Sequence, residues 1–315
     1  MSFQIKESIR ILLVCFGVSY ILYSVYTTKN HEAAVLYSLD CPVMNNNIAP
    51  AESIDIRSAI KPLPYTEWTY DASAIPPRFC VIVRTVIFHQ SKLYALMMSL
   101  LTNRPPSLQV FLVNTDASPF PSLQDMTEHA NHMAGSQIFH DVTHLFNASS
   151  ARDRFGDVNF DRYGFVVTDM VMEHILQLPD QCEYLLITNG DNLYGNGFFP
   201  AVWEKIREGF NAIGVHFISH YEWAPPPPDQ PCGSLRGGAD LEVRSAIKRN
   251  CMDMGGAVFS LHLIKKHIRL IITEMDWAKV DTTRSQSADG YFFDALMQQD
   301  GARGVIIPRV LMIHQ

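Results

Sequence analysis

Three acidic residues and one histidine stand where strands are expected to end or a helix to begin. Asp116 and Asp191 each follow an apolar run, Asp289 opens the last helical pattern, and His314 ends another apolar run. Ligands of open α/β sheets bind outside the carboxyl ends of the strands, so groups placed there are in position for chemistry. Carboxylate and imidazole groups together can hold Mn²⁺ or Mg²⁺ against a diphosphate. A diphosphate leaving group needs such a metal to stabilise its developing negative charge.

Each of these residues also has a structural interpretation. Asp191 closes an Asn-Gly turn, which is common in hairpins, and Asp116 fits an ordinary loop before Pro119. Asp289 would stabilise a helix N-terminus by ~0.5 kcal/mol whatever the chemistry. His314 is penultimate, and a lone histidine is more often structural than a ligand. Both interpretations stay open at this point.

The elements that must position these residues begin with a strand, a helix and a second strand. Residues 79–85 form a short apolar run that is typical of a buried strand. Apolar residues then recur at helical spacing from Leu93 to Leu101, behind Ser91 as a candidate N-cap. Residues 109–114 form the next apolar run. Together they predict a βαβ unit.

The same alternation continues toward the end of the chain. A helical pattern at 167–178 leads into a strand at 183–188, and another strand is expected at 212–219. A turn at Gly255 and Gly256 leads into a strand at 257–260, and a helix is predicted over 261–275. Alternating strands and helices predict an α/β fold, with a mostly parallel sheet of the Rossmann-like kind flanked by helices.

The first part of the chain has a different composition. Residues 11–26 carry no charge and follow Lys6 and Arg10. This run is a little shorter than the ~20 residues of a full bilayer span. No clear cleavage site follows it, so we favour an uncleaved anchor over a secretory signal peptide. The predicted organisation is a cytosolic head at 1–10, a transmembrane signal anchor at 11–27, a stem at 28–77 and a lumenal domain at 78–315.

A lumenal domain would fold in an oxidising compartment, where disulfides are permitted. Cys232 and Cys251 bracket one polar segment and form a candidate pair, and Cys80 and Cys182, each at the start of a strand, form another. Asn147 begins a glycosylation sequon that this placement would make usable.

The charge of the chain narrows the range of partners. The net charge is −7 and no run of Lys or Arg occurs, so the chain lacks the electrostatic footprint of a nucleic-acid-binding protein. His140 and His144 stand at helical i, i+4 spacing, which could present a zinc pair. The glutamate of the metalloprotease pattern is absent, so surface histidines are the favoured interpretation.

Taken in order, the motifs resemble a known family. The βαβ unit, the strand end at Asp116, the strand leading to Asp191, the segments 253–257 and 288–292 and the final histidine are similar to nucleotide-sugar-dependent glycosyltransferases of the GT-A fold (family 2-like). The resemblance covers about residues 79–314. It implies transfer of a sugar from a nucleoside diphosphate sugar to a hydroxyl of a glycan, protein or lipid. It also implies a single-pass type II protein of the Golgi or endoplasmic reticulum membrane.

The resemblance assigns roles at the donor end of the site. Thr85 and Asp116 would contact the nucleotide, and Asp191 would coordinate the metal and the diphosphate. His314 would complete the site for Mn²⁺ or Mg²⁺. Asn189 occupies the first acidic position of the Asp-x-Asp motif, where an amide can hydrogen-bond a ribose but adds no charge. This departure weakens the metal assignment.

Further roles concern the sugar and the acceptor. Gly255 and Gly256 would line both, where backbone must approach closely. Asp289 stands where inverting members keep the carboxylate that removes the acceptor's proton. Trp223, which precedes a proline run, could stack on an acceptor sugar ring or simply pack its loop.

Two other functions remain as alternatives. A membrane-anchored carbohydrate-binding or scaffolding protein could keep the fold and lack activity, which Asn189 favours. A nucleotidyltransferase would bind a nucleoside triphosphate, but no glycine-rich, basic phosphate loop follows the first strand.

Overall fold

The computed structural model describes residues 76–116, 118–146, 164–178, 182–220, 232–234, 241–264 and 288–315, all within one unit, Thr66–Gln315. The predicted head, anchor and nearly all of the stem lie outside these residues, as do Asn147 and Trp223. No helix in the described ranges has the length and apolar character needed to cross a bilayer.

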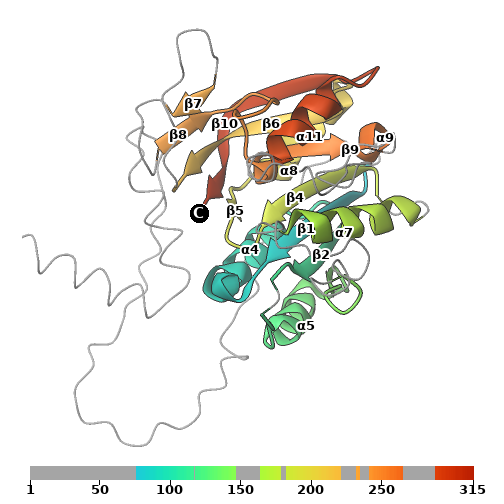
Figure 1. Cartoon of the computed structure of the whole chain (residues 1–315), viewed down its shortest axis with the longest axis vertical. Coiled ribbons are helices and arrows are strands. Elements are labelled where there is room, and N and C mark those ends of the chain that lie inside the picture. Colours follow the sequence, from blue (N-terminus) through green and yellow to red (C-terminus); the bar gives the residue numbers. More distant parts are fainter. Residues whose placement is uncertain are drawn as a thin grey trace, which may run out of the picture. The chain divides into compact units, whose positions relative to one another are not determined.

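Parallel strands form the first half of the sheet, in the order β3-β2-β1-β4. Figure 1 labels β2, β1 and β4 of this half. The chain forms this half from β1 (Phe79–Thr85), η1 (Ile87–His89), α4 (Gln90–Thr102), β2 (Leu108–Asn114), α5 (Leu123–Ala134), β3 (Phe139–Asp141), α7 (Phe165–Gln177) and β4 (Tyr184–Asn189). Every residue of β1 is buried, as expected for a central parallel strand with both faces covered. The predicted βαβ unit is confirmed.

The second half of the sheet is mixed and continues in the order β9-β6-β10-β5, with β8 and β7 paired beside β6. Its elements are β5 (Leu193–Tyr194), α8 (Phe198–Arg207), β6 (Ala212–Ser219), β7 (Gly233–Ser234), β8 (Leu241–Arg244), η2 (Met254–Gly256), β9 (Ala257–Ser260), α9 (Leu261–Ile264), α11 (Ala288–Met297) and β10 (Gly304–His314). The longest pairings, β1 with β2 and β6 with β10, are parallel, whereas β9 is antiparallel to both of its neighbours.

Helices cover both faces of the sheet, which makes the predicted α/β architecture (Figure 1). Alternate β1 residues face opposite ways because side chains on a strand alternate. Val81 and Val83 pack in the same core cluster as α4, α5 and α8, whereas Ile82 packs with α7, α9 and α11. The sheet is thus held between two apolar layers, and the polar residues that end its strands lie at the edge, outside these layers.

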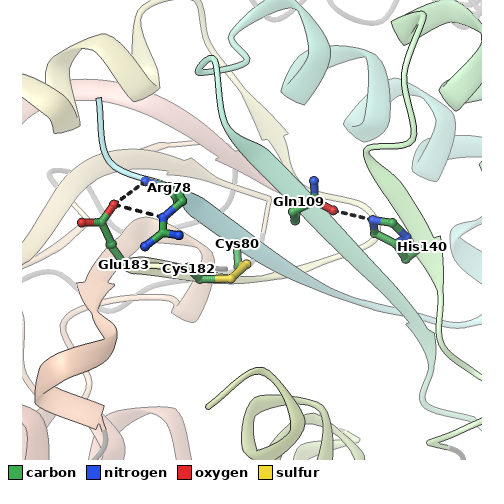
Figure 2. The surroundings of a disulfide bond; sticks show 6 residues. All are labelled: Arg78, Cys80, Gln109, His140, Cys182 and Glu183. Carbon is green, nitrogen blue, oxygen red and sulfur yellow. Dashed lines mark hydrogen bonds and ion pairs between the residues drawn. A yellow bond between two sulfur atoms is a disulfide. The ribbon is translucent and has the colours of Figure 1, made fainter. Parts of the chain in front are cut away.

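Three sequence-based expectations need correction or limitation. Helix α4 begins at Gln90 directly after η1, so Ser91 lies inside its first turn and is not the N-cap. His140 lies in strand β3 and its ring bonds Gln109 of β2 (Figure 2), so His140 and His144 do not share a helical face. Only residues 261–264 of the helix predicted over 261–275 are described.

Both predicted disulfides are present. Cys80 of β1 and Cys182, just before β4, are joined where the two parallel strands begin, beside an ion pair between Arg78 and Glu183 (Figure 2). Cys232 and Cys251 are also joined. Disulfides form and persist in oxidising compartments such as the secretory pathway, and their presence here is typical of such a domain.

Replacing Cys80 and Cys182 together by alanine should lower the free energy of unfolding by about 2–4 kcal/mol, because this bridge restricts the unfolded chain. The bridge spans 102 residues, whereas Cys232–Cys251 spans 19. The chain-entropy relation therefore gives the second bridge an effect about 1.5 kcal/mol smaller. Urea unfolding of the two double variants measures the difference. Equal losses would contradict the loop-length argument.

Candidate functional site

The strand order reverses between β1 and β4, which makes a topological switch point. From β1 the chain continues through β2 to β3 on one side, and β4 lies on the other. Ligands of open α/β sheets bind in the crevice outside the carboxyl ends of the strands at such a point. Thr85 ends β1, Asn189 ends β4, and Asp191 follows in the next turn. The structure therefore brings these three predicted residues to one edge.

Gly190 packs the turn after β4 directly onto the end of β1. Its N–H donates to the Arg84 carbonyl at 2.7 Å. A Cβ at Gly190 would lie 2.6 Å from Thr85 Oγ1 and 2.9 Å from His89 Nδ1. Both of these atoms are buried, and neither has a hydrogen-bond partner in the described part of the chain. Because buried polar groups are normally paired, the two atoms mark a place for a polar group of a ligand or a water.

Asp191 is paired with a residue that the sequence analysis did not select. Asp191 Oδ2 lies 3.7 Å from His89 Nε2, and Asp191 is only 7% exposed. Burial lowers the pKa of His89, and Lys92 and Arg84 lower it further, while Asp191 opposes the shift. His89 is therefore mostly neutral at pH 7, which leaves the negative charge of Asp191 largely uncancelled. Only its place one short turn after β1 could have identified His89.

Asp116 lies at the same edge, in the loop after β2. Thr85 pairs with Asn114 in the sheet, so the two strand ends are adjacent. The Asp116 N–H donates to Asn114 Oδ1 at 3.1 Å, and Asp116 Oδ1 accepts from the Ser118 N–H at 3.3 Å. Such local bonds are typical of Asx turns. They hold the loop but leave the function of Asp116 open.

His314 also has a carboxylate partner, Asp253. The distance between His314 Nε2 and Asp253 Oδ2 is 3.3 Å, and His314 Nδ1 lies 3.3 Å from Ser219 Oγ. Asp253 Oδ1 accepts from the Gly255 N–H at 2.8 Å. Asp253 was part of a motif noted in the sequence, but it had no assigned role. Its proximity to His314 depends on a contact between distant segments that the sequence does not indicate.

The two predicted metal ligands therefore have separate partners, Asp191 with His89 and His314 with Asp253. β10 runs parallel to β6, and both run antiparallel to β9, as does β4. The ends of β4 and β10 consequently lie at the same edge of the sheet. Within the described ranges, no three His, Cys, Asp or Glu residues are grouped as a metal site.

Gly255 is the point at which the η2 turn, next to Asp253, packs against the turn after β4 that carries Asp191. A Cβ on this residue would lie 2.7 Å from Asn192 Nδ2 and 2.9 Å from Thr188 Oγ1, so the η2 turn packs closely on the turn after β4. The Gly255 carbonyl accepts a bond from the Tyr194 hydroxyl at 3.0 Å. At Gly256 the nearest atom would be 3.5 Å away. The close backbone approach is therefore at Gly255.

Asp289 is the second residue of α11, and its Oδ1 accepts from the Gly290 N–H at 2.8 Å. Burial raises the pKa of Asp289 to about 6, and the charge of Asp253 adds to this effect. The Gly290 N–H and Arg84 act in the opposite direction. A carboxyl group with this pKa is mostly ionised at pH 7 and can still accept a proton.

Replacing Gly190 by alanine should disturb the contact between the turn after β4 and the end of β1 without unfolding the domain. The added methyl group would force Thr85 and His89 apart, at a cost of about 1–3 kcal/mol in stability. We expect the affinity for nucleoside diphosphates that the resemblance implies to fall at least about tenfold, or ~1.4 kcal/mol. Gly195→Ala is the control, because its Cβ would meet nothing nearer than 3.8 Å. Calorimetry on both variants measures the effect, and equal affinities would contradict it.

No protein family model matches the chain, and no curated protein matches its sequence. Solved structures do match. For residues 1–349 of S. aureus TarS, identity is 13%, the TM-score is 0.47, and the match covers 75% of this chain and 60% of that one. TarS was also solved with UDP and with UDP-GlcNAc. Mouse xyloside xylosyltransferase 1 matches at 12% identity and TM-score 0.41, covering 74% of this chain and 85% of that one.

Proposed function

We propose that this protein is a glycosyltransferase that moves a sugar from a nucleoside diphosphate sugar to an acceptor hydroxyl. One observation carries the proposal. Asp289, a carboxyl group with a pKa of about 6, lies within electrostatic reach of Asp253. Through Gly255, Asp253 belongs to the same edge as Asp191. A proton acceptor near a sheet edge with unpaired polar atoms supports catalysis as well as binding.

The donor would lie across the ends of β1 and β4. Thr85 Oγ1 and His89 Nδ1 are available to bond it, and the Asn189 amide can bond a ribose hydroxyl. Asp116 would lie near the base, at the end of β2. Gly255 and Gly256 would line the sugar and the acceptor from the η2 turn.

Mn²⁺ or Mg²⁺ is the proposed cofactor, with Asp191 and His314 among its ligands. The carboxylate and imidazole donors at this edge suit such ions. Mg²⁺ is usually bound by one or two carboxylates together with substrate phosphates, so a group of three protein ligands is not required. A bound ion would stabilise negative charge on the departing diphosphate.

Asp289 would act as the general base of an inverting transfer. It takes the proton of the acceptor hydroxyl while the hydroxyl oxygen forms a bond to the anomeric carbon. The bond from that carbon to the diphosphate oxygen breaks, and the nucleoside diphosphate leaves with its electron pair. Attack from the opposite face inverts the configuration of the sugar.

The proposed setting is the lumen of the Golgi or the endoplasmic reticulum, with a type II anchor at residues 11–27. The two disulfides support an oxidising compartment. Trp223 is proposed to stack on the acceptor, which would be a glycan, a protein or a lipid. Trp223 and the anchor both lie outside the described residues.

Thermal unfolding of the full chain with a panel of nucleoside diphosphates and nucleotide sugars tests the proposal, followed by a transfer assay with the best donor. A ligand at ~100 times its Kd should stabilise the protein by ~2.7 kcal/mol. Stabilisation by no nucleoside diphosphate would overturn the proposal. A preference for nucleoside triphosphates would favour a nucleotidyltransferase instead.

Asn189 favours a second candidate, an inactive protein of this fold that binds carbohydrate or scaffolds other proteins. The residue supplies no charge at a position where the resemblance expects a carboxylate. This candidate predicts that Mn²⁺ does not enhance binding of nucleoside diphosphates and that no donor is turned over. Calorimetry with and without Mn²⁺ separates the two.

A further inference from the structure

We propose that Asp253 supplies the carboxylate that Asn189 lacks, and that it binds the divalent ion together with His314. The inference rests on the proposed function, since it names a ligand of the metal in that same site. It assigns a metal-binding role to the N-cap residue of η2, the short turn that precedes β9.

The Asp253–His314 pair has the geometry of two ligands held ready for an ion. Asp253 Oδ1 is fixed by the Gly255 N–H at 2.8 Å, which leaves Oδ2 directed to His314 Nε2 at 3.3 Å. Ser219 Oγ lies 3.3 Å from the other imidazole nitrogen. Metal-binding histidines are commonly oriented by a hydrogen bond at the second nitrogen. One oxygen and one nitrogen thus converge with their orientations already set.

Asn192 provides an independent observation beside this pair. The residue is fully buried, and its Nδ2 donates to Thr188 Oγ1 at 3.0 Å. Its Oδ1 is buried and has no hydrogen-bond partner in the described part of the chain. The Asn192 amide packs against Gly255, two residues after Asp253. The unpaired amide oxygen of this side chain is a further oxygen donor of the type that hard cations bind.

The charges at this edge support the same assignment. With asparagine at 189, the turn after β4 offers one carboxylate, Asp191. Asp253, only 8% exposed, adds a second from a different segment. Two carboxylates together with phosphate oxygens form the usual environment of Mg²⁺ in nucleotide-dependent enzymes. The alternative is a purely structural ion pair, which would need no metal.

The test is a titration of the full chain with Mn²⁺ alone, in which electron paramagnetic resonance reports the free ion. We expect Asp253→Asn to weaken Mn²⁺ binding at least about tenfold. The asparagine oxygen can still accept the Gly255 N–H, so the turn should keep its shape. His314→Gln should weaken binding similarly. Asp125→Asn, an exposed change on α5 that removes the same charge, is the control and should bind as the wild type does.

A double variant, Asp253→Asn with Asn189→Asp, tests whether Asp253 takes the place of the carboxylate that is missing at position 189. If Asp253 replaces the missing carboxylate, the second change should recover at least part of the lost affinity. Wild-type Mn²⁺ affinity in Asp253→Asn, or equal loss in Asp125→Asn, would overturn the inference. Donor turnover by the wild type is measured separately. Turnover with unchanged Mn²⁺ binding in Asp253→Asn would refute the role of Asp253 and leave the proposed function standing.

Discussion

Asp191→Ala is expected to lower kcat/KM for sugar transfer about 10³-fold while the domain stays folded. Asp191 provides the charged group at the switch point, with its carboxylate buried beside a mostly neutral His89. Loss of one preorganised electrostatic contact to developing charge typically costs about 10²–10³ in rate. Loss of the proposed metal contact adds to this. Steady-state transfer assays with saturating Mn²⁺ measure the effect.

Two further variants make the result specific. Asp191→Asn keeps the size of the side chain and should be nearly as inactive, because the charge is what matters. Asp125→Ala removes a carboxylate exposed on α5 and should retain wild-type turnover. Metal-dependent turnover that persists in Asp191→Ala would show that the turn after β4 is only a turn.

Asp289→Asn is expected to lower kcat about 10²–10⁴-fold, the usual contribution of a general base. In the wild type, kcat/KM should rise with pH through about 6, where Asp289 loses its proton. This acidic limb should disappear from the residual activity of the variant. Unchanged turnover would mean that Asp289 only stabilises the start of α11, or that the enzyme retains the anomeric configuration without such a base.

The same substitution should stabilise the fold at neutral pH. The pKa of Asp289 is about 6 in the folded protein and ~3.9 in the unfolded chain. Between these values the folded state holds a proton that the unfolded state has released. The stabilisation from this group is therefore complete below pH 4 and is lost as the pH rises to 6. An uncharged amide in place of the Asp289 carboxylate would avoid this loss of folding stability, which reaches about 3 kcal/mol at pH 7. Urea unfolding of the wild type and Asp289→Asn at pH 4 and pH 7 tests the sign.

Much of the sheet could be predicted because buried strands have a strong apolar signature. The runs that became β1, β2, β4, β6, β9 and β10 were all identified. The direction of β9 was not, since a strand of four residues carries no information about which neighbours it will meet. Helix α8 was also missed. Gly195, Gly197 and Pro200 resemble a turn, although proline is tolerated in the first turn of a helix, where the N–H needs no partner.

The residues of the candidate site likewise include some that the sequence identifies and some that only the structure reveals. Thr85, Asp191 and Asp289 could be selected because each ends or begins a regular element. His89 and Asp253 were not selected, because their relevance comes from contacts across long sequence separations, with Asp191 and with His314. A single sequence contains no pairing information for such contacts. Both residues gain significance only when the sheet brings the strand ends together.

The reversed direction of β9 has a consequence for how related sequences can vary. Val258 packs into one apolar layer, whereas Ala257 and Phe259 pack into the other. Losing or gaining one residue in the turn before β9 would exchange these faces and would also move Asp253. A side chain at Gly255 would clash with Asn192 and Thr188, and the length of the turn is fixed by both cores and by the site at once. In relatives with this topology, insertions should therefore accumulate elsewhere and spare residues 253–257.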